Sequence, residues 1–508
     1  MKIAIIGSGM AGLTAGAYLA KAGHAVTVFE QFPAPGGVTA TVTQDGFGWD
    51  IGPLLVEGFA PGDKGRIILE ELGVSDRAPS VHEDRGLSMP EFALWHPKEY
   101  EGPYWRRERL KKLFPQESEH LDRYYRFYDR MMNLTSLARQ AESARGLAAL
   151  WLKLRMWVAF QGVKNKVNWN GAQLMDHYFE SPVLKTFFMG IVADFVTTPS
   201  EFPALGVPSL HLETAFDKRI PTFPGTRSAQ TAYSYILGGC QKLVEAVMSV
   251  IIANGGKVLT STTVKRIIIE NGRATGVEIA NGHVEPAERV LVSGGMKEAF
   301  FDLVGREIIP AELITQIESN HMMESVLMVQ LGIDFDPTPY QPAALCYYYK
   351  TQDLEGTVRR LRSGYFHEGK GGFLIYFPSL HSPALAPAGK HAVTIYTIAP
   401  DILAEGTWSE RKEELADKLV AEAEVHVPGL RQHTLTRMIL TPEDYRRRTA
   451  QKQHSFGGVP PVIGNKPPAH KTPIDGLWFI GAQSESAGGV LNVMAGAQKV
   501  AKRIIQGE

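Results

Sequence analysis

The first thirty residues constrain the fold more than any other part of this chain. An apolar run, Lys2-Ile3-Ala4-Ile5-Ile6, leads into glycines at positions 7, 9 and 12. Residues 10–22 then carry Ala, Leu and Tyr at helical spacing, and residues 25–29 form a β-branched run that ends at Glu30. This order predicts a strand, a tight turn, a helix and a second parallel strand, which together make a βαβ unit.

The glycines of Gly7-Ser8-Gly9-Met10-Ala11-Gly12 have the spacing of a dinucleotide-binding turn. The first makes the turn, the second lets the backbone approach a pyrophosphate, and the third lets the helix pack against the strand. The free N–H groups and the dipole of the helix N-terminus favour the anion. Glu30 is placed to accept hydrogen bonds from ribose hydroxyls, and its carboxylate would repel the 2′-phosphate of NADP. FAD and NAD remain.

Two further features favour FAD. Pro35-Gly36-Gly37-Val38 follows the second strand, and Trp49-Asp50-Ile51-Gly52-Pro53 comes soon after it. The last segment predicts a strand over 477–480, then Gly481-Ala482, Gly488-Gly489-Val490 and a helix that ends at Ile505. The N-terminus of that helix would face the N1–C2=O edge of a flavin and stabilise its negative charge on reduction.

The remaining pattern predicts two interleaved domains, as the length of 508 residues suggests. The sequence pattern of residues 85–235 is helical. Further along the chain, the pattern predicts a helix over 243–252, strands over 257–259, 264–269, 275–279 and 289–292, and a helix over 409–425. We therefore predict an α/β fold. A doubly wound, Rossmann-type, glutathione-reductase-like FAD-binding domain (1–84, 236–298 and 454–508) is interleaved with a substrate domain of mixed sheet and helices (85–235 and 299–453).

Composition excludes several classes of function. The chain has 53 basic and 54 acidic residues, so its net charge of −1 gives no reason to expect nucleic acid as a partner. The two cysteines, Cys240 and Cys346, exclude a disulfide framework and a cysteine-rich metal site, and indicate a reducing, cytoplasmic setting. No His-x-x-x-His spacing is evident, so we predict no metal. The oligomeric state is not readable from the sequence.

The chain resembles the phytoene desaturase, carotenoid isomerase and retinol saturase group of flavoproteins, within the wider amine-oxidase-like superfamily. The resemblance covers nearly the whole chain and is strongest over 1–75, 235–296 and 371–505. Besides the N-terminal glycines and Glu30, the residues that carry it are Gly36-Gly37, Gly46-Phe47-Gly48-Trp49-Asp50-Ile51-Gly52, Leu237-Gly238-Gly239, Pro378-Ser379-Leu380, Leu385-Ala386-Pro387-Ala388-Gly389-Lys390-His391, Gly481-Ala482 and Gly488-Gly489-Val490.

The resemblance implies FAD as the cofactor, and it implies that these positions contact FAD or shape its cleft. It also implies that the backbone at Val264 contacts the adenine. The cofactor-binding residues that we predict from the motifs and the resemblance are Gly7, Ser8, Gly9, Met10, Ala11, Gly12, Glu30, Gln31, Gly36, Gly37, Val38, Gly52, Pro53, Val264, Gly481, Ala482, Gly489, Val490 and Val493.

One position and one segment depart from the pattern of phytoene desaturases. Val38 stands where those enzymes usually have Arg, and isomerase-like and saturase-like relatives often have a small or apolar residue there. The tail reads Ser484-Glu485-Ser486-Ala487-Gly488-Gly489-Val490-Leu491, whereas many relatives have Thr-x-Pro-Gly-x-Gly-Val-Pro. The substrate-facing edge of the flavin is therefore expected to differ from that of the desaturases.

Catalysis on a polyene by a flavin needs few protein acids or bases, because the flavin exchanges the hydride. No catalytic residue is assigned from the sequence. His211 and Glu213, two residues apart, and His454, near Gly457-Gly458, are the candidates for handling a proton. Aromatic residues at 347–349 and 373–377 either line an apolar tunnel or form the core of a sheet.

One segment raises the question of membrane contact. Residues 139–166 carry six positive charges and one negative charge, and Leu and Trp recur between them at helical spacing (Leu147, Leu150, Trp151, Leu154, Trp157 and Val158). A basic amphipathic helix with Trp is typical of an interfacial anchor, although a core-facing helix with a solvated basic face has the same pattern. The resemblance favours peripheral contact with the inner face of a membrane.

The leading hypothesis is an FAD-dependent oxidoreductase that acts on carbon–carbon double bonds of an apolar, isoprenoid-like or carotenoid-like substrate, by desaturation, isomerisation or saturation. One alternative is a flavin amine oxidase that makes an imine and hydrogen peroxide. It would need a lysine near flavin N5 and an aromatic cage for the amine. Another alternative is a non-catalytic lipid-chain escort protein of the same fold.

Overall fold

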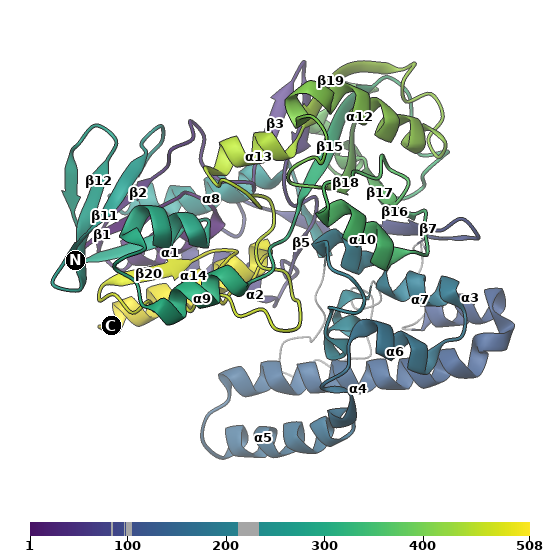
Figure 1. Cartoon of the computed structure of the whole chain (residues 1–508), viewed down its shortest axis with the longest axis horizontal. Helices are drawn as coiled ribbons and strands as arrows, with labels where there is room; N and C mark the ends of the chain where they lie inside the picture. The colour runs from purple at the N-terminus through teal and green to yellow at the C-terminus, as the bar shows by residue number, and fades with distance from the viewer. Residues whose placement is uncertain (83–84, 96, 98–103, 212–232) are drawn as a thin grey trace.

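The computed structural model describes residues 1–82, 85–95, 97, 104–211 and 233–508. These residues form three bodies (Figure 1). A parallel sheet with its covering layers lies on the left, a seven-stranded sheet at the upper right, and a group of helices at the lower right. The first and last segments of the chain both belong to the parallel-sheet body, so the chain leaves this body and returns to it.

The parallel sheet has the strand order β10-β2-β1-β14-β20. Its central strand pairs with a neighbour on each side, and Ile5 lies between Val28 and Leu291. β2 and β10 lie on one side of β1, and β14 and β20 lie on the other, so the order reverses between β1 and β14. In sheets of this kind, ligands bind outside the carboxyl ends of the strands at that reversal. The strands are β1 (Lys2–Ile6), β2 (Ala25–Phe29), β10 (Lys257–Leu259), β14 (Arg289–Ser293) and β20 (Leu477–Ile480).

The two faces of this sheet have different covers. Ile3 and Ile5 pack into the same cluster as the buried faces of α1 (Met10–Lys21), α2 (Lys64–Leu72), α8 (Cys240–Ala253) and α14 (Val490–Ile505). Ala4 points the other way, toward the antiparallel strands β11 (Val264–Glu270), β12 (Arg273–Ile279) and β13 (Val284–Pro286), and toward η6 (Glu298–Gly305) and α9 (Ala311–Ser319). The βαβ unit and the hairpin predicted at Asn271-Gly272 are confirmed, and both turn residues have positive φ.

The second sheet has seven strands in the order β19-β15-β18-β17-β16-β7-β8. Its strands are β19 (Thr434–Leu440), β15 (Ser325–Ile333), β18 (His391–Ala399), β17 (Gly372–Tyr376), β16 (Leu345–Tyr349), β7 (Arg85–Ser88) and β8 (Ala93–Trp95). The prediction of helix from residue 85 onward is wrong for β7 and β8. β7 is a strand because β16, some 260 residues later, supplies its hydrogen bonds in a parallel pairing.

Further elements connect the two sheets or pack against them. The strands are β3 (Thr41–Gln44), β4 (Phe47–Asp50), β5 (Val56–Glu57), β6 (Ser80–His82) and β9 (Tyr233–Ile236), and the helices are α10 (Leu354–Arg362), α11 (Pro378–His381), η7 (Pro383–Leu385), α12 (Trp408–Glu424) and α13 (Pro442–Thr449). The helix predicted over 409–425 is therefore confirmed as α12. It covers one face of the seven-stranded sheet.

The helical body is built around α4 (Ser118–Ser143). Tyr124 and Tyr128 of α4 pack against Phe179 and Phe188 in a buried aromatic core. Its other elements are α3 (Trp105–Leu113), η1 (Pro115–Glu117), α5 (Gly146–Gln161), η2 (Lys164–Lys166), α6 (Gly171–Tyr178), α7 (Pro182–Met189), η3 (Gly190–Phe195) and η4 (Ala204–Leu210). None of the described helices combines the length and the apolar character that crossing a bilayer requires.

Candidate cofactor site

The turn between β1 and α1 is shaped around its glycines. Gly7 has φ +93°, and a Cβ there would lie 2.8 Å from the carbonyl oxygen of Ser293. A Cβ at Gly12 would lie 2.0 Å from the carbonyl oxygen of Gly7. At Gly9 a Cβ would meet only the Ser293 hydroxyl, at 3.9 Å. The fold therefore requires Gly7 and Gly12, whereas Gly9 leaves open space outside the turn for another molecule.

The N-terminus of α1 has free donors. Within the described residues, the N–H groups of Met10, Ala11 and Gly12 have no hydrogen-bond acceptor in the protein, and no side chain caps the helix at Gly9. The first turn also contains no acidic residue. Unpaired N–H groups beside an open glycine backbone bind phosphate groups, so this turn fits the diphosphate of FAD.

Glu30 connects the carboxyl ends of β1 and β2. Its side chain is 6 % exposed, and its Oε2 accepts hydrogen bonds from the N–H of Ser8 at 2.9 Å and from the Ser8 hydroxyl at 2.6 Å. Its Oε1 accepts a hydrogen bond from the N–H of Phe32 at 2.8 Å. A carboxylate has about four acceptor positions, so one remains for a ribose hydroxyl.

The glycine pair 36–37 lies directly on the turn. Gly36 donates to the carbonyl of Ser8 at 3.0 Å and pairs with Gly9 in a parallel bridge. A Cβ at Gly37 would lie 3.4 Å from the Cα of Gly9, and one at Gly52 would lie 2.1 Å from the carbonyl oxygen of Val38. The positive φ of Gly37, +59°, and the close contact at Gly52 explain why glycine stands at both positions, and Val38, next to Gly37, lies beside the open turn.

The end of the chain returns to the same place. A Cβ at Gly481 would lie 3.2 Å from the Ser293 hydroxyl and 3.9 Å from the Cβ of Ala11. Ala482 follows directly, and Gly489 precedes α14, whose Val490 and Val493 are buried in the cluster that α1 also joins. The sequence alone could not place these segments next to the glycine turn.

Two backbone hydrogen bonds join the segment before Val264, where the resemblance predicts the adenine, to the end of β2. The N–H of Thr262 donates to the carbonyl of Glu30 at 2.8 Å, and the N–H of Ser261 donates to the carbonyl of Phe32 at 3.2 Å. Val264, at the start of β11, follows Thr262 by two residues, so these bonds bring its segment to Glu30 and Gln31. The carbonyl of Pro53 accepts a hydrogen bond from the thiol of Cys240, the first residue of α8, at 3.3 Å. The assignment of each individual residue to cofactor binding stays a prediction.

Asp50 is a buried acid within the Trp49-Asp50-Ile51-Gly52 motif. Its Oδ1 accepts from the hydroxyl of Thr41 at 2.6 Å and from the N–H of Cys240, the first residue of α8, at 2.8 Å, and its Oδ2 has no hydrogen-bond partner. Burial raises the pKa of Asp50 to about 6, although the donors from Thr41 and Cys240 oppose the shift. Its position within the Trp49-Asp50-Ile51-Gly52 motif was the only signal in the sequence.

One face of the seven-stranded sheet is turned toward this site. Tyr347, Tyr376 and Tyr396 lie in a buried cluster that Val38 also contacts. Tyr348 points to the opposite face, where its ring stacks on Phe373 at a centroid distance of 5.3 Å. The aromatic run at 347–349 therefore divides between a wall near the cofactor turn and the core beneath α12.

An acid not found from the sequence lies on this wall. Tyr347 donates a hydrogen bond to Asp194 of η3, and burial raises the pKa of Asp194 to about 7, while Tyr347 and the charge of Arg85 oppose that shift. No spacing motif marks this residue, because its partners come from β16 and β7.

The proton-handling candidates lie elsewhere. His211 is buried in the helical body, where its Nε2 is 2.5 Å from the hydroxyl of Tyr124. Glu213 lies outside the described residues. His454 is partly buried, with Nδ1 3.1 Å from the carbonyl oxygen of Met323. None of the described contacts of His211 or His454 reaches the glycine turn, and a catalytic role for either stays a prediction.

Residues 139–166 do not form one helix. The chain breaks at Ala144, which is extended, and at Gly146, which has φ +59°, so the segment comprises the end of α4, all of α5 and η2. α5 packs against α4 at the lower edge of the molecule (Figure 1). Six of its exposed apolar residues form one stripe, with exposed fractions from 56 % to 85 %: Leu147, Leu150, Trp151, Leu154, Trp157 and Val158. Lys166 is instead buried against aromatic rings.

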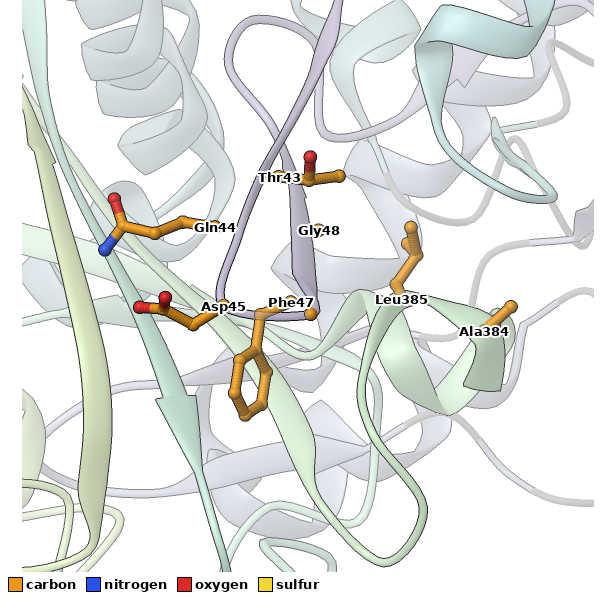
Figure 2. A pocket seen from close by; sticks show the side chains of 8 residues that line it. Thr43, Gln44, Asp45, Phe47, Gly48, Ala384 and Leu385 are labelled. Carbon is orange, nitrogen blue, oxygen red and sulfur yellow. The ribbon is translucent and has the colours of Figure 1, made fainter.

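A small pocket lies at the turn of the β3–β4 hairpin (Figure 2), with a cavity volume of about 210 Å³. Typical ligand pockets measure roughly 300–1,000 Å³. Gly48 packs here on Leu385, and Gly46 on Pro387, so two of the motif segments contact each other. None of the lining residues belongs to the predicted cofactor set. Among the described residues, no group of His, Cys, Asp and Glu side chains could hold a metal ion.

Comparisons with known proteins show what this chain is similar to. The family model described as flavin containing amine oxidoreductase matches residues 10–505. A chloroplastic prolycopene isomerase from an Oncidium hybrid cultivar is 25% identical over 515 residues, covering 98% of this chain and 83% of the relative. A 4,4′-diapophytoene desaturase from a Methylomonas species is 22% identical over 99% of this chain and 95% of the relative. A solved oxidoreductase structure from Methanosarcina mazei has a TM-score of 0.63 at 20% identity, covering 99% of this chain and all of that one.

Proposed function

Because this chain belongs to the family of flavin-containing amine oxidoreductases and is an FAD-dependent oxidoreductase, we propose that it acts on carbon–carbon double bonds of an apolar, isoprenoid-like substrate. The reaction would be a desaturation, an isomerisation or a saturation. The resemblance to a prolycopene isomerase and to a diapophytoene desaturase supports this substrate class.

One structural observation carries the proposal. The face of the seven-stranded sheet nearest the glycine turn presents Tyr347, Tyr376 and Tyr396 together with aliphatic side chains, and Val38 of the cofactor loop packs against them. An apolar wall next to the cofactor suits a hydrocarbon chain, whose burial is favourable and needs few hydrogen bonds.

The residues of this chain have two tasks in such a reaction. Bound FAD would exchange the hydride. The glycine turn and Glu30 would hold the cofactor, and the sheet wall would exclude water and align the substrate. Asp194, whose pKa burial raises to about 7, could hold or release a proton at its carboxyl oxygen beside that wall.

Anaerobic absorbance spectra test the proposal. The purified protein is mixed with carotenoids and retinoids in detergent, and its flavin bands are followed. Bleaching by a polyene indicates desaturation. A polyene that changes only after the flavin is reduced with dithionite indicates isomerisation or saturation. A protein whose flavin bands ignore every polyene but bleach with a primary amine, and that forms hydrogen peroxide once air is admitted, would be an amine oxidase instead. A protein without flavin bands would fit the escort alternative.

A membrane contact through α5 forms the second part of the proposal. The stripe from Leu147 to Val158 is exposed along the outer side of α5, and the flanking charges Arg145, Lys153 and Lys164 are exposed too. Residues 144–167 contain no acid. Exposed Leu and Trp with basic flanks suit an anionic lipid surface, from which an apolar substrate could enter. We place the protein in the cytoplasm, at the inner face of a membrane. Sedimentation with lipid vesicles tests this placement.

A further inference from the structure

The cofactor site found from the sequence contains no cation. The segments 5–20, 30–53, 290–296 and 481–493 contain neither Lys nor Arg, whereas Glu30 adds a negative charge beside the turn. FAD brings a diphosphate with two further negative charges. The N–H groups at the start of α1 offer only partial positive charge, so the site as read from the sequence is electrostatically incomplete.

Arg448 reaches this site from the far end of α13. Its Nε donates a hydrogen bond to the carbonyl oxygen of Gly37 at 2.5 Å, and its guanidinium carbon lies 4.5 Å from the centre of the Phe32 ring. Gly37 in turn contacts Gly9, the glycine that leaves open space at the turn. The guanidinium is therefore held one residue away from the backbone that the diphosphate would approach.

The electrostatic surroundings of Arg448 agree with this position. Burial lowers the pKa of Arg448, and the carboxylate of Glu30 opposes that shift, so the two charges are close enough to interact. The planar guanidinium has five N–H donors, of which Nε is used on Gly37. Among the described residues, the two terminal nitrogens have no hydrogen-bond acceptor in the protein, which leaves them available to phosphate oxygens.

We propose that Arg448 is the cation that binds the diphosphate of FAD in this protein, and that it does so from outside the nucleotide-binding segments. α13 packs against α12, β15 and β19 of the second sheet, and Arg448 crosses from that body to the glycine turn. Cofactor binding would thus tie the second sheet to the parallel-sheet body. The inference rests on FAD as the cofactor and holds for any substrate.

The test compares two neighbouring arginines of α13 in the FAD-loaded protein. Arg448→Gln removes the proposed charge, and Arg447→Gln is the matched control, because Arg447 is 73 % exposed and pairs with Asp444 on the surface. Flavin release on dilution is followed by the recovery of flavin fluorescence, at low and at high salt, and a thermal unfolding curve checks the fold of each variant.

We expect Arg448→Gln to release flavin on the order of ten- to a hundredfold faster than the native protein at low salt. Its release should depend less on salt, since a screened charge pair has been lost. ADP, which carries the diphosphate, should compete poorly with FAD for the site of this variant. Adenosine, which lacks the diphosphate, should compete with FAD as well as it does in the native protein. Arg448→Lys keeps the charge and should restore part of the salt dependence.

Three results would overturn the assignment. Arg448→Gln could release flavin at the rate of Arg447→Gln, it could keep the full salt dependence, or it could weaken competition by adenosine as much as by ADP. None of these readouts involves a polyene, so they remain distinct from a failure of the proposed reaction. Native protein that purifies without flavin would instead refute the cofactor assignment itself.

Discussion

The hydroxyl and the N–H of Ser8 both donate to the same oxygen of Glu30, at 2.6 and 2.9 Å. Ser8 is the second residue of the glycine turn, and Glu30 ends the next strand. The pair therefore joins the two structural elements that the dinucleotide has to touch, and it sets the turn before any cofactor arrives. Preorganised donors and acceptors of this kind lower the cost of binding.

The first prediction concerns this pair. In Glu30→Gln, the amide nitrogen must face either Ser8 or the N–H of Phe32, which leaves a buried donor without an acceptor. The free energy of unfolding should fall by about 1–3 kcal/mol, and flavin should be retained less well. Urea denaturation and the flavin-to-protein ratio measure the two effects. Glu70→Gln, on the surface, is the control, and equal midpoints for both variants would contradict the prediction.

The second prediction separates two glycines of one motif. A side chain at Gly9 meets nothing closer than 3.9 Å, and its φ of −64° suits any residue, so Gly9→Val should fold normally but lose FAD. A Cβ at Gly12 would lie 2.0 Å from a carbonyl oxygen, so Gly12→Ala should lower the melting temperature even of flavin-free protein. Flavin absorbance and thermal unfolding distinguish the two. A Gly9→Val protein with full flavin content would refute the role of this turn.

The third prediction concerns the exposed stripe of α5. Trp151→Ser combined with Trp157→Ser removes two side chains that are 56 % and 62 % exposed, so the fold should be unaffected. Sedimentation with vesicles that contain anionic lipid should fall at least severalfold, because interfacial binding scales with the buried apolar area. Val425→Ser, at a residue that is 70 % exposed outside α5, is the matched control. Unchanged sedimentation together with loss of a dimer would show that a second copy covers the stripe.

The fourth prediction follows from the raised pKa of Asp50. The folded protein keeps the proton of Asp50 up to about pH 6, whereas the unfolded chain loses it near the ordinary pKa of an aspartate, 3.8. Stability should therefore fall as the pH rises through this window, by up to about 3 kcal/mol for this group. Asp50→Asn has no proton to lose and keeps an oxygen for Thr41 and Cys240.

Urea unfolding across the same window checks this effect. The free energy of unfolding of Asp50→Asn, relative to that of the native protein, should increase as the pH rises from about 4 to about 6. Asp76→Asn, at an exposed residue, is the control. Parallel pH curves for the native protein and Asp50→Asn would show that Asp50 stays charged in the fold.

Local patterns of the sequence were sufficient for the core of the nucleotide-binding body. Gly7, Gly9 and Gly12 follow an apolar strand and open a helix, and such patterns depend on neighbours within a few residues. The same holds for the hairpin at Asn271-Gly272 and for the helix α12. The spacing of the motifs thus determined the fold class and, together with the family resemblance, the cofactor, and it predicts where the phosphate-binding turn lies.

Only the tertiary structure decided which distant residues meet at the site. Arg448 contacts Gly37 across 411 positions of the chain, Asp194 bonds to Tyr347 of another element, and β7 becomes a strand only by pairing with β16. The stripe of α5 had two interpretations in the sequence, since a helical period shows that an apolar face exists but not what covers it. Contacts of this kind come from packing between elements, and no local pattern encodes their partners.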